Sequence, residues 1–260
     1  MLSYQHGFHA GNRADVLKHA VLDAFLKDAS GGRQPILYVE THSGRARYDL
    51  TGADAKKTGE AESGVIALLE DAPGIVKPWV DTVRQAGINN YPGSPALAVE
   101  RLSERDRMVF FELHPTEHKA LNTALGDDDR IQIRKSDGYA GALKLAPRRG
   151  ERMMVFVDPS YETLRDMDAM AEWTPRALKR WPKAEIILWL PLFRDEREAD
   201  FGAYLASLED GVVAGARWKV DPSDETALAG SAIVAYRVSE GAADKAAGIA
   251  AALQGHWSKR

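Results

Sequence analysis

Apolar residues recur at helical spacing close to the start of the chain. Between residues 14 and 27 they fall three and four positions apart, which is the pattern of a helix with one buried face. Asn12 is a suitable N-cap, and Asp15 lies in the first turn, where the helix dipole favours an acidic side chain. Gly31-Gly32 follows the last apolar position and marks the end of the predicted helix.

Seven short apolar runs follow this helix, and most break off at polar or turn-forming residues. The earlier runs are separated by segments of helix length, as is typical of parallel strands covered by helices on both faces. The last two come in quick succession, which favours one strand that returns antiparallel. We therefore expect an α/β fold with a Rossmann-like sheet of about seven strands, the last antiparallel. The runs are PILYVETHSG, RMVFFELHP, RIQIRKSDG, RMMVFVDPSY, AEIILWLPL, GVVAGARWKV and GSAIVAYRV.

One interval between predicted strands is too long for a crossover helix. Between Glu40, where the first strand is expected to end, and Met108, where the second is expected to start, lie 67 residues. Residues 49–92 contain two helical stretches, GEAESGVIALLEDA and PGIVKPWVDTVRQAG. We expect a main domain of residues 1–48 and 93–260, with residues 49–92 inserted after the first strand as a small helical subdomain.

Composition excludes several classes of function. The chain of 260 residues is 45% hydrophobic and 28% charged, as expected for a globular protein with a large core. It contains no cysteine, which excludes disulfides, thiolate nucleophiles and metal sites held by cysteine. No apolar stretch reaches transmembrane length and no signal-peptide core is present, so we expect a cytoplasmic protein without a membrane partner.

Net charge restricts how the protein can meet nucleic acid. A net charge of −4 argues against coating nucleic acid by bulk attraction, but binding depends on the local patch. Each basic cluster, taken singly, is more often a solvated face than a phosphate site. The clusters are Arg45 with Arg47, Lys56-Lys57, Arg134-Lys135, Arg148-Arg149, and Arg176 with Lys179, Arg180 and Lys183.

Acidic residues stand at or just after the ends of the first four predicted strands. Ligands of open α/β sheets bind beyond the carboxyl ends of the strands. Glu40 and Glu112 stand at the ends of the first two predicted strands, and Asp137 and Asp158 stand just after the next two. A carboxylate after the second strand suits the hydroxyls of a ribose, and one after the third can accept from the amine of an adenine. The pattern indicates a site for an adenosine-containing cofactor.

The loop after the first strand helps to choose among such cofactors. A dinucleotide requires a G-x-G-x-x-G loop that brings the backbone close to the pyrophosphate, and this chain has neither that motif nor a P-loop. The stretch THSGRARY offers the single Gly44. S-adenosylmethionine has no phosphate and needs only a glycine of close approach, so the sequence favours a methyl donor.

The stretch MMVFVDPSYE suggests what receives the methyl group. An adenine N6 amine is a poor nucleophile because its lone pair is delocalised into the ring. The carboxylate of Asp158 and the carbonyl of Pro159 can accept its two hydrogens, and the ring of Tyr161 can stack on the base. Such a base must first be flipped out of its stack.

Several motifs together resemble one known family. The Asp-Pro-Ser-Tyr stretch resembles the (D/N/S)-P-P-(Y/F/W) tetrapeptide of amino-methyltransferases. The blocks YQHGFHAGNRADVLKH, ETHSGRARY, YPGSP, FELHP, SDG and LAGSAIVAY are similar to those of bacterial 23S ribosomal RNA adenine-N6 methyltransferases of the RlmJ type. The resemblance extends across nearly the whole chain, and the N-terminal block is its most specific part.

The resemblance implies roles for individual residues. It makes Asp158 the proton-accepting catalytic residue, together with Pro159 and Tyr161. It places Tyr4, His6, Lys18 and Tyr161 at the substrate. It implies cofactor contacts, with Gly44 included as the glycine of close approach, at His19, His42, Gly44, Ser94, Glu112, Asp137, Gly138 and Asp158. A metal site is not expected, because the histidines have no metal-binding spacing.

The function implied is S-adenosylmethionine-dependent methylation of N6 of one adenine in 23S ribosomal RNA. The RNA is expected to be free or partly assembled, and the protein to act as a monomer. One alternative is a DNA adenine-N6 methyltransferase. Another is a non-catalytic RNA-binding or ribosome-assembly protein that retains a cofactor pocket.

The chain departs from the family pattern at three places. Ser160 replaces the second proline of the tetrapeptide, so the loop loses a residue with a locked φ. Ala46 stands where a second glycine is expected in the first loop. VAYRV replaces an Asn-Pro-Pro-Trp ending after the last strand, a change that bears on C-terminal substrate contacts more than on catalysis. Trp173 and Trp181 flank a basic segment, and core packing is the favoured interpretation of both.

Overall fold

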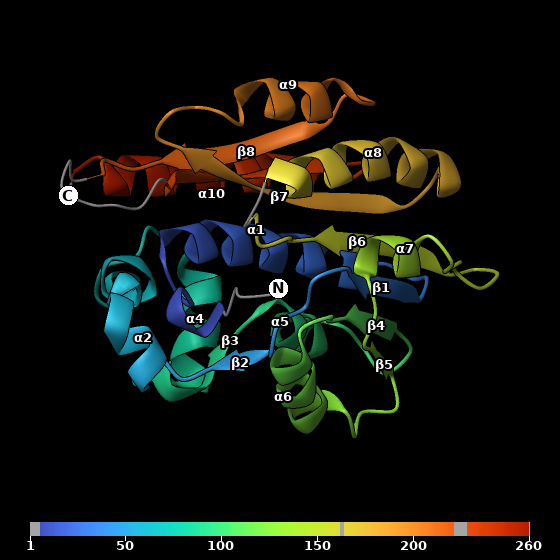
Figure 1. Cartoon of the computed structure of the whole chain (residues 1–260), viewed down its shortest axis with the longest axis horizontal. Coiled ribbons are helices and arrows are strands. Elements are labelled where there is room, and N and C mark those ends of the chain that lie inside the picture. The colour runs from blue at the N-terminus through green and yellow to red at the C-terminus, as the bar shows by residue number, and fades with distance from the viewer. Residues whose placement is uncertain (1–5, 162–163, 221–227, 260) are drawn as a thin grey trace.

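The computed structural model of the protein describes residues 6–161, 164–220 and 228–259, so Tyr4 lies outside the described residues. Its centre is a seven-stranded sheet of order β5-β4-β1-β6-β7-β9-β8 (Figure 1). The strands are β1 (Ile36–Glu40), β4 (Arg107–Phe111), β5 (Ile131–Arg134), β6 (Arg152–Val157), β7 (Glu185–Phe193), β8 (Val212–Arg217) and β9 (Leu228–Tyr236).

Each of the seven apolar runs of the sequence forms one strand of this sheet. β1 pairs in parallel with β4 and β6, and β9 pairs antiparallel with both β7 and β8. The predicted Rossmann-like α/β fold with an antiparallel last strand is confirmed. The carboxyl ends of β1, β4, β5 and β6 consequently meet at one edge of the sheet.

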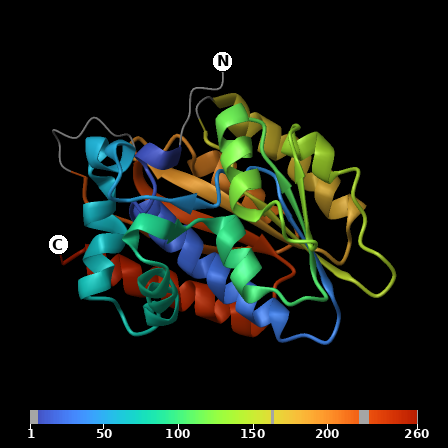
Figure 2. The same ribbon diagram turned by 90° about the horizontal axis from the view of Figure 1, so that it is seen from below.

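Helices cover both faces of the sheet (Figure 2). Successive strand side chains point to opposite faces, so each face is apolar and forms a core with its own helices. Tyr38 and Phe110 belong to the core under the first group of helices, and Val39 and Phe111 belong to the core under the second. The first group is α1 (Arg13–Ser30), α5 (Ser94–Arg101), α6 (Pro115–Leu125) and α10 (Glu240–Trp257). The second is α7 (Gly138–Ala142), α8 (Leu164–Arg180) and α9 (Ala199–Ser207).

Helix α1 has the ends that the sequence predicts. The side chain of Asn12 accepts a hydrogen bond from the backbone N–H of Asp15, and Gly31 caps the last turn. Trp173 and Trp181 of the α8 region are both buried, so their interpretation as core residues is confirmed. None of the described helices is long and apolar enough to cross a membrane.

The long interval after β1 is mostly helical and packs onto the main core. It contains α2 (Ala53–Thr58), η2 (Glu62–Ile66), α3 (Ala67–Glu70), α4 (Lys77–Ala86) and η3 (Ile88–Asn90). Val65, Leu68, Trp79, Val80 and Val83 share the core that α1 enters. The boundaries at residues 49 and 92 stay a prediction.

Two features of this interval differ from the sequence prediction. The stretch around η2 is kinked at Gly64, where a side chain would meet the carbonyl of Gly11 at 2.1 Å. A two-stranded ribbon of β2 (Arg47–Tyr48) and β3 (Tyr91–Pro92) also forms there. Strands of two residues carry no hydrophobic period, so the sequence pattern could not predict them.

Candidate active site

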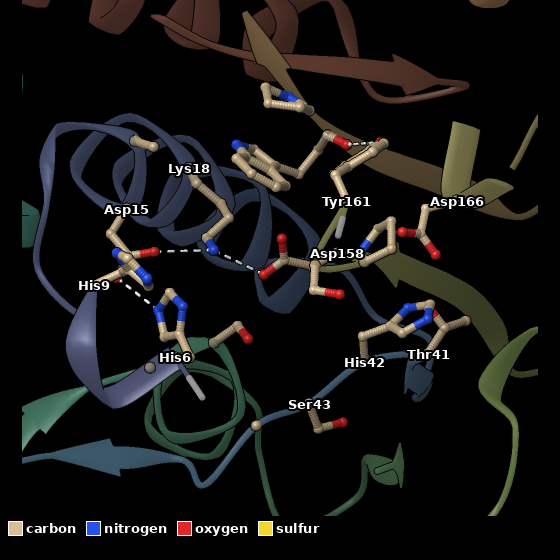
Figure 3. A pocket seen from close by; sticks show the side chains of 18 of the residues that line it. His6, His9, Asp15, Lys18, Thr41, His42, Ser43, Asp158, Tyr161 and Asp166 are labelled. Carbon is tan, nitrogen blue, oxygen red and sulfur yellow. Dashed lines mark hydrogen bonds and ion pairs between the residues drawn. The ribbon is translucent and has the colours of Figure 1, made fainter. Parts of the chain in front are cut away.

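A cavity of about 660 Å³ opens at the carboxyl ends of the parallel strands. The structure places every predicted site residue except Tyr4 in its lining (Figure 3). These residues are His6, Lys18, His19, His42, Gly44, Ser94, Glu112, Asp137, Gly138, Asp158, Pro159 and Tyr161. They come from distant parts of the sequence, and their roles stay a prediction.

Asp158 and Lys18 form the central ion pair of the cavity. Nζ of Lys18 lies 2.8 Å from Oδ2 of Asp158 and 2.9 Å from Oδ1 of Asp15. Asp15 also accepts hydrogen bonds from the His6 ring, at 2.9 Å, and from the backbone N–H of Gly11. In the described part of the chain, Oδ1 of Asp158 has no hydrogen-bond partner, so one carboxylate oxygen is left for a ligand.

The charges of this cluster depend on one another. Burial raises the pKa of Asp158 above its usual value, and the ammonium of Lys18 opposes that rise. Burial lowers the pKa of Lys18, but the carboxylates of Asp15 and Asp158 raise it by more, so the lysine keeps its charge. Burial also raises the pKa of Asp15, yet His6 and the ammonium of Lys18 hold its pKa well below the usual value.

His19 is held in one orientation by Tyr91. The Tyr91 hydroxyl lies 2.8 Å from Nδ1 of His19, and both residues are buried. Burial lowers the pKa of His19 to about 3, so the ring is neutral. If Nδ1 carried the proton, the buried hydroxyl hydrogen of Tyr91 would have no acceptor among the described residues. The arrangement therefore favours the tautomer with the proton on Nε2.

Substituting Tyr91 by Phe is expected to remove this preference for the Nε2–H tautomer. Long-range ¹H–¹⁵N spectra of labelled protein should show His19 protonated on Nε2 in the wild type and a mixture of tautomers in Tyr91→Phe. Tyr236→Phe is the matched control, because that buried hydroxyl donates to the carbonyl of Leu205 on another helix. A wild-type His19 protonated on Nδ1 would contradict the assignment.

His42 is a second neutral imidazole at the cavity. Its Nδ1 lies 2.8 Å from the hydroxyl of Thr41, and its ring meets that of Tyr139 edge to face at 5.0 Å. Burial lowers the pKa of His42 to about 4, although Asp137 opposes the fall. The ring therefore presents an uncharged surface at the end of β1.

Glu40 is a fully buried carboxyl directly behind the cavity lining. It accepts hydrogen bonds from the hydroxyls of Tyr38, at 2.7 Å, and Ser94, at 3.0 Å. Burial raises its pKa to about 8 against the effect of both hydrogen bonds. Because Ser94 lines the cavity, Glu40 fixes the orientation of one predicted cofactor contact.

Glu112 shapes the first loop of the site. Its two carboxylate oxygens accept from the backbone N–H groups of Gly44, at 2.8 Å, and His114, at 2.7 Å. Gly44 and Ala46 both have left-handed backbones, with φ of 64° and 69°. Ala46 therefore adopts the conformation for which a glycine was expected, at the strain cost of a Cβ there.

Asp137 and Gly138 bring α7 against the end of β1. Asp137 caps α7 by accepting from the backbone N–H of Ala140 at 2.7 Å. A Cβ on Gly138 would lie 1.9 Å from the carbonyl oxygen of Thr41, so no other residue fits without moving the backbone. This close approach packs the start of α7 against the backbone that follows β1.

Tyr161 lies at the cavity in a constrained conformation. Its φ is 51°, which is unusual for an aromatic residue. Its hydroxyl donates to the carbonyl of Trp189 at 2.7 Å, and the two rings meet edge to face at 5.4 Å. Ser160 also lines the cavity, so the departure from the second proline falls inside the site.

The third departure from the family pattern lies away from the cavity. β9 runs antiparallel, so Leu228 at its start lines the cavity while Tyr236 at its end lies at the opposite edge. Tyr236 is buried and bonded to Leu205, as expected of a core residue. The replaced ending therefore does not alter the cavity wall.

Two cavity-lining hydroxyls have no partner. Oγ of Ser43 and the hydroxyl of Tyr139 are buried and make no hydrogen bond in the described part of the chain. An unsatisfied buried hydroxyl is costly, and such groups commonly mark a place where a ligand supplies the partner. A ligand with several donors and acceptors therefore fits this cavity.

Sequence reasoning missed four residues of this site. Asp15 was assigned only to the helix dipole, and Tyr91, Ser43 and Tyr139 were not selected. The spacing of Asp15 and Lys18, three positions apart on one helix face, was the available signal for the first. No local sequence pattern points to the other three, because their importance comes from residues that only the fold brings close to them.

Comparisons with known proteins agree with the motifs. The family model described as "Ribosomal RNA large subunit methyltransferase D, RlmJ" matches residues 33–249. The Escherichia coli K12 protein named ribosomal RNA large subunit methyltransferase J is 34% identical over 198 residues, which are 74% of this chain and 71% of that protein. The protein of the same name from Haemophilus influenzae Rd is 33% identical over 199 residues, again 74% and 71% of the two chains.

A solved structure shows the same fold. The crystal structure of a Legionella pneumophila protein superposes with a TM-score of 0.81 at 24% identity, and the match covers 95% of this chain and 94% of that one. The family model and the two relatives confirm, over most of the chain, the resemblance that the motifs indicate. The chain belongs to the RlmJ family of ribosomal RNA large subunit methyltransferases.

Proposed function

We propose that this chain transfers a methyl group from S-adenosylmethionine to N6 of one adenine in 23S ribosomal RNA. Membership of the family supports methylation of ribosomal RNA. The observation that supports N6 of adenine as the target is the carboxylate of Asp158. It lies in the cavity at the end of β6 with Oδ2 held by Lys18 and Oδ1 left for the substrate.

The cavity residues fit S-adenosylmethionine. The ribose hydroxyls would lie at Glu112 and the adenine at Asp137, while the unpartnered hydroxyls of Ser43 and Tyr139 offer further contacts. His19 would present Nε2–H to the amino-acid end of the molecule, which carries a carboxylate acceptor. When bound, the cofactor supplies a methyl group activated by a positively charged sulfur.

Asp158 prepares the amine that receives this methyl group. Oδ1 of Asp158 and the carbonyl of Pro159 would accept the two N6 hydrogens and hold the nitrogen lone pair toward the methyl group. Positioning of this kind supplies much of the rate of a transfer reaction. Asp158 is the group placed to remove the N6 proton, and the ammonium of Lys18 favours its ionised form against the rise in pKa that burial causes.

Tyr161 and the N-terminal residues would hold the target base. The hydroxyl of Tyr161 is committed to Trp189, so its ring is fixed before a base arrives. An adenine flipped from its stack can pack on such a ring. His6 and Lys18 lie on the same side of Asp158 (Figure 3), and Tyr4 of the same N-terminal motif is expected to contact the base.

The substrate is expected to be free or partly assembled RNA in the cytoplasm, because a flipped base must be accessible. We expect one copy of the chain to act alone, since all predicted site residues within the described ranges meet at one cavity. DNA adenine methylation and a non-catalytic role in ribosome assembly are the alternatives.

Incubation with radiolabelled methyl donor and protein-free 23S RNA tests the proposal. Digestion of the product to nucleosides should give label only in N6-methyladenosine, and intact large subunits should accept much less. Label at another atom, label in DNA instead of RNA, or no label at all would each refute the proposed function.

A further inference from the structure

Seven cations from two separate stretches of sequence gather toward the end of the sheet opposite Asp158. All seven side chains are exposed. We name them the distal basic surface. They are Lys144, Arg148, Arg149, Arg176, Lys179, Arg180 and Lys183. In Figure 1, the C-terminal half of α8 and the segment after α7 both lie at the right-hand side of the molecule.

Two buried indoles join the two stretches. Nε1 of Trp173 donates to the carbonyl of Tyr139 at 2.9 Å, and Nε1 of Trp181 donates to the carbonyl of Leu145 at 3.1 Å. The two indole rings also meet edge to face at 6.1 Å. α8 is therefore fixed along the segment after α7, and the cations of both stretches flank one seam.

The charge of this surface is not neutralised by the protein. None of the seven side chains forms an ion pair with any residue in the described ranges. Two nearby acids pair with other cations, Glu151 with Arg107 at 2.8 Å and Glu185 with Arg152, which leaves Glu172 of α8 as the acid next to Arg176 in the helix. A chain of net charge −4 thus concentrates unpaired positive charge in one place.

The lengths of two elements give the distance from the distal basic surface to the catalytic centre. β6 has 6 residues between Glu151 and Asp158, which corresponds to roughly 20 Å. α8 has 17 residues between the cavity and Trp181, which corresponds to roughly 25 Å. A nucleic acid that spans this distance extends several base pairs from the target nucleotide.

We infer that the distal basic surface binds the phosphate backbone of the RNA substrate, in a helical segment several base pairs from the methylated adenine. Unpaired lysines and arginines spread over a surface match the regular phosphates of a duplex and read no base sequence. The inference rests on the proposed function and adds a second contact region to it. Its prediction is that binding depends on RNA beyond the immediate neighbours of the target.

The triple variant Arg149→Gln, Lys179→Gln and Lys183→Gln tests this contact. On a long 23S fragment, KM should rise about tenfold or more with kcat nearly unchanged, because the catalytic cavity is intact. The slope of log Kd against log salt should fall by roughly 2, since each lost phosphate contact removes about 0.7–0.9. On a short hairpin that contains the target, both kinetic constants should stay within about twofold of the wild type.

The control is a triple variant with the same change of net charge at exposed lysines elsewhere, namely Lys77→Gln, Lys245→Gln and Lys259→Gln. It should leave KM and the salt slope unchanged. An unchanged KM of the first variant on the long fragment, or binding of the wild type to anionic vesicles but not to RNA duplex, would overturn the inference. If the wild type methylates no RNA, the proposed function fails. The affinities of the two triple variants for an RNA duplex then still test whether the distal basic surface binds RNA.

Discussion

Replacing Asp158 by Asn is expected to reduce methyl transfer to RNA by a factor of roughly 10²–10⁴. Lys18 donates to Oδ2 of Asp158 at 2.8 Å, so the amide oxygen of the asparagine will take that position. The amide NH₂ then replaces Oδ1 and turns donors toward the two N6 hydrogens. The variant loses both the acceptor that aligns the amine and the base that removes its proton.

Cofactor affinity should change far less than the rate in Asp158→Asn, because most of the predicted contacts remain. Isothermal titration with S-adenosylmethionine and single-turnover transfer to 23S RNA separate the two quantities. Asp23→Asn is the matched control, since Asp23 is also a buried carboxylate paired with a lysine, Lys27, at 2.7 Å, but lies outside the cavity. It should lose stability and keep its rate per folded molecule. A near-wild-type rate for Asp158→Asn would remove Asp158 from the mechanism.

The sequence predicted the sheet because its strands are buried on both faces. Runs such as RMMVFV in β6 are apolar at every position but the first, and such runs stand out against polar connections. The kink in the segment after β1 was harder to predict. The kink at Gly64 exists because that residue lies against the backbone of Gly11, and no local pattern encodes a contact with a segment fifty residues away.

The candidate site was predictable for a related reason. Parallel strands place their carboxyl ends together, so Glu112, Asp137 and Asp158 could be assigned to one site before their positions were known. Their partners could not be assigned in this way. Lys18 reaches Asp158 from a helix 140 positions earlier, and Tyr91 reaches His19 from a two-residue strand 72 positions later.

The resemblance to a family identified residues, and the structure gives the physical reasons. His6 and Lys18 were attributed to the N-terminal motif without a mechanism. Both bind Asp15, and through Lys18 the N-terminal segment reaches the proposed catalytic carboxylate. The motif is therefore one electrostatic unit, in which the protonation of Asp158 depends on residues of α1.

Replacing Lys18 by Met is expected to destabilise the protein by about 3–5 kcal/mol near pH 8 and by much less near pH 4. Two buried carboxylates, Asp15 and Asp158, lose the cation that they share. The pKa of Asp158 is already raised by burial, and without Lys18 it rises further. A carboxyl whose folded pKa is raised favours folding below its unfolded pKa, and this contribution is lost as pH rises through the folded value. The penalty of the variant therefore grows from about pH 4 upward.

The same substitution should move the acidic limb of the activity profile to higher pH, because more alkaline solution is needed to ionise Asp158. Denaturant unfolding at several pH values and single-turnover rates across the same range measure the two effects. Lys27→Met is the matched control on the same helix, because Lys27 pairs with Asp23 at the usual i,i+4 spacing but is 33% exposed. It should cost less than about 1 kcal/mol at any of these pH values, because exposed pairs contribute little. A Lys18→Met penalty that is independent of pH, with an unshifted activity profile, would show that the lysine does not control the ionisation of Asp158.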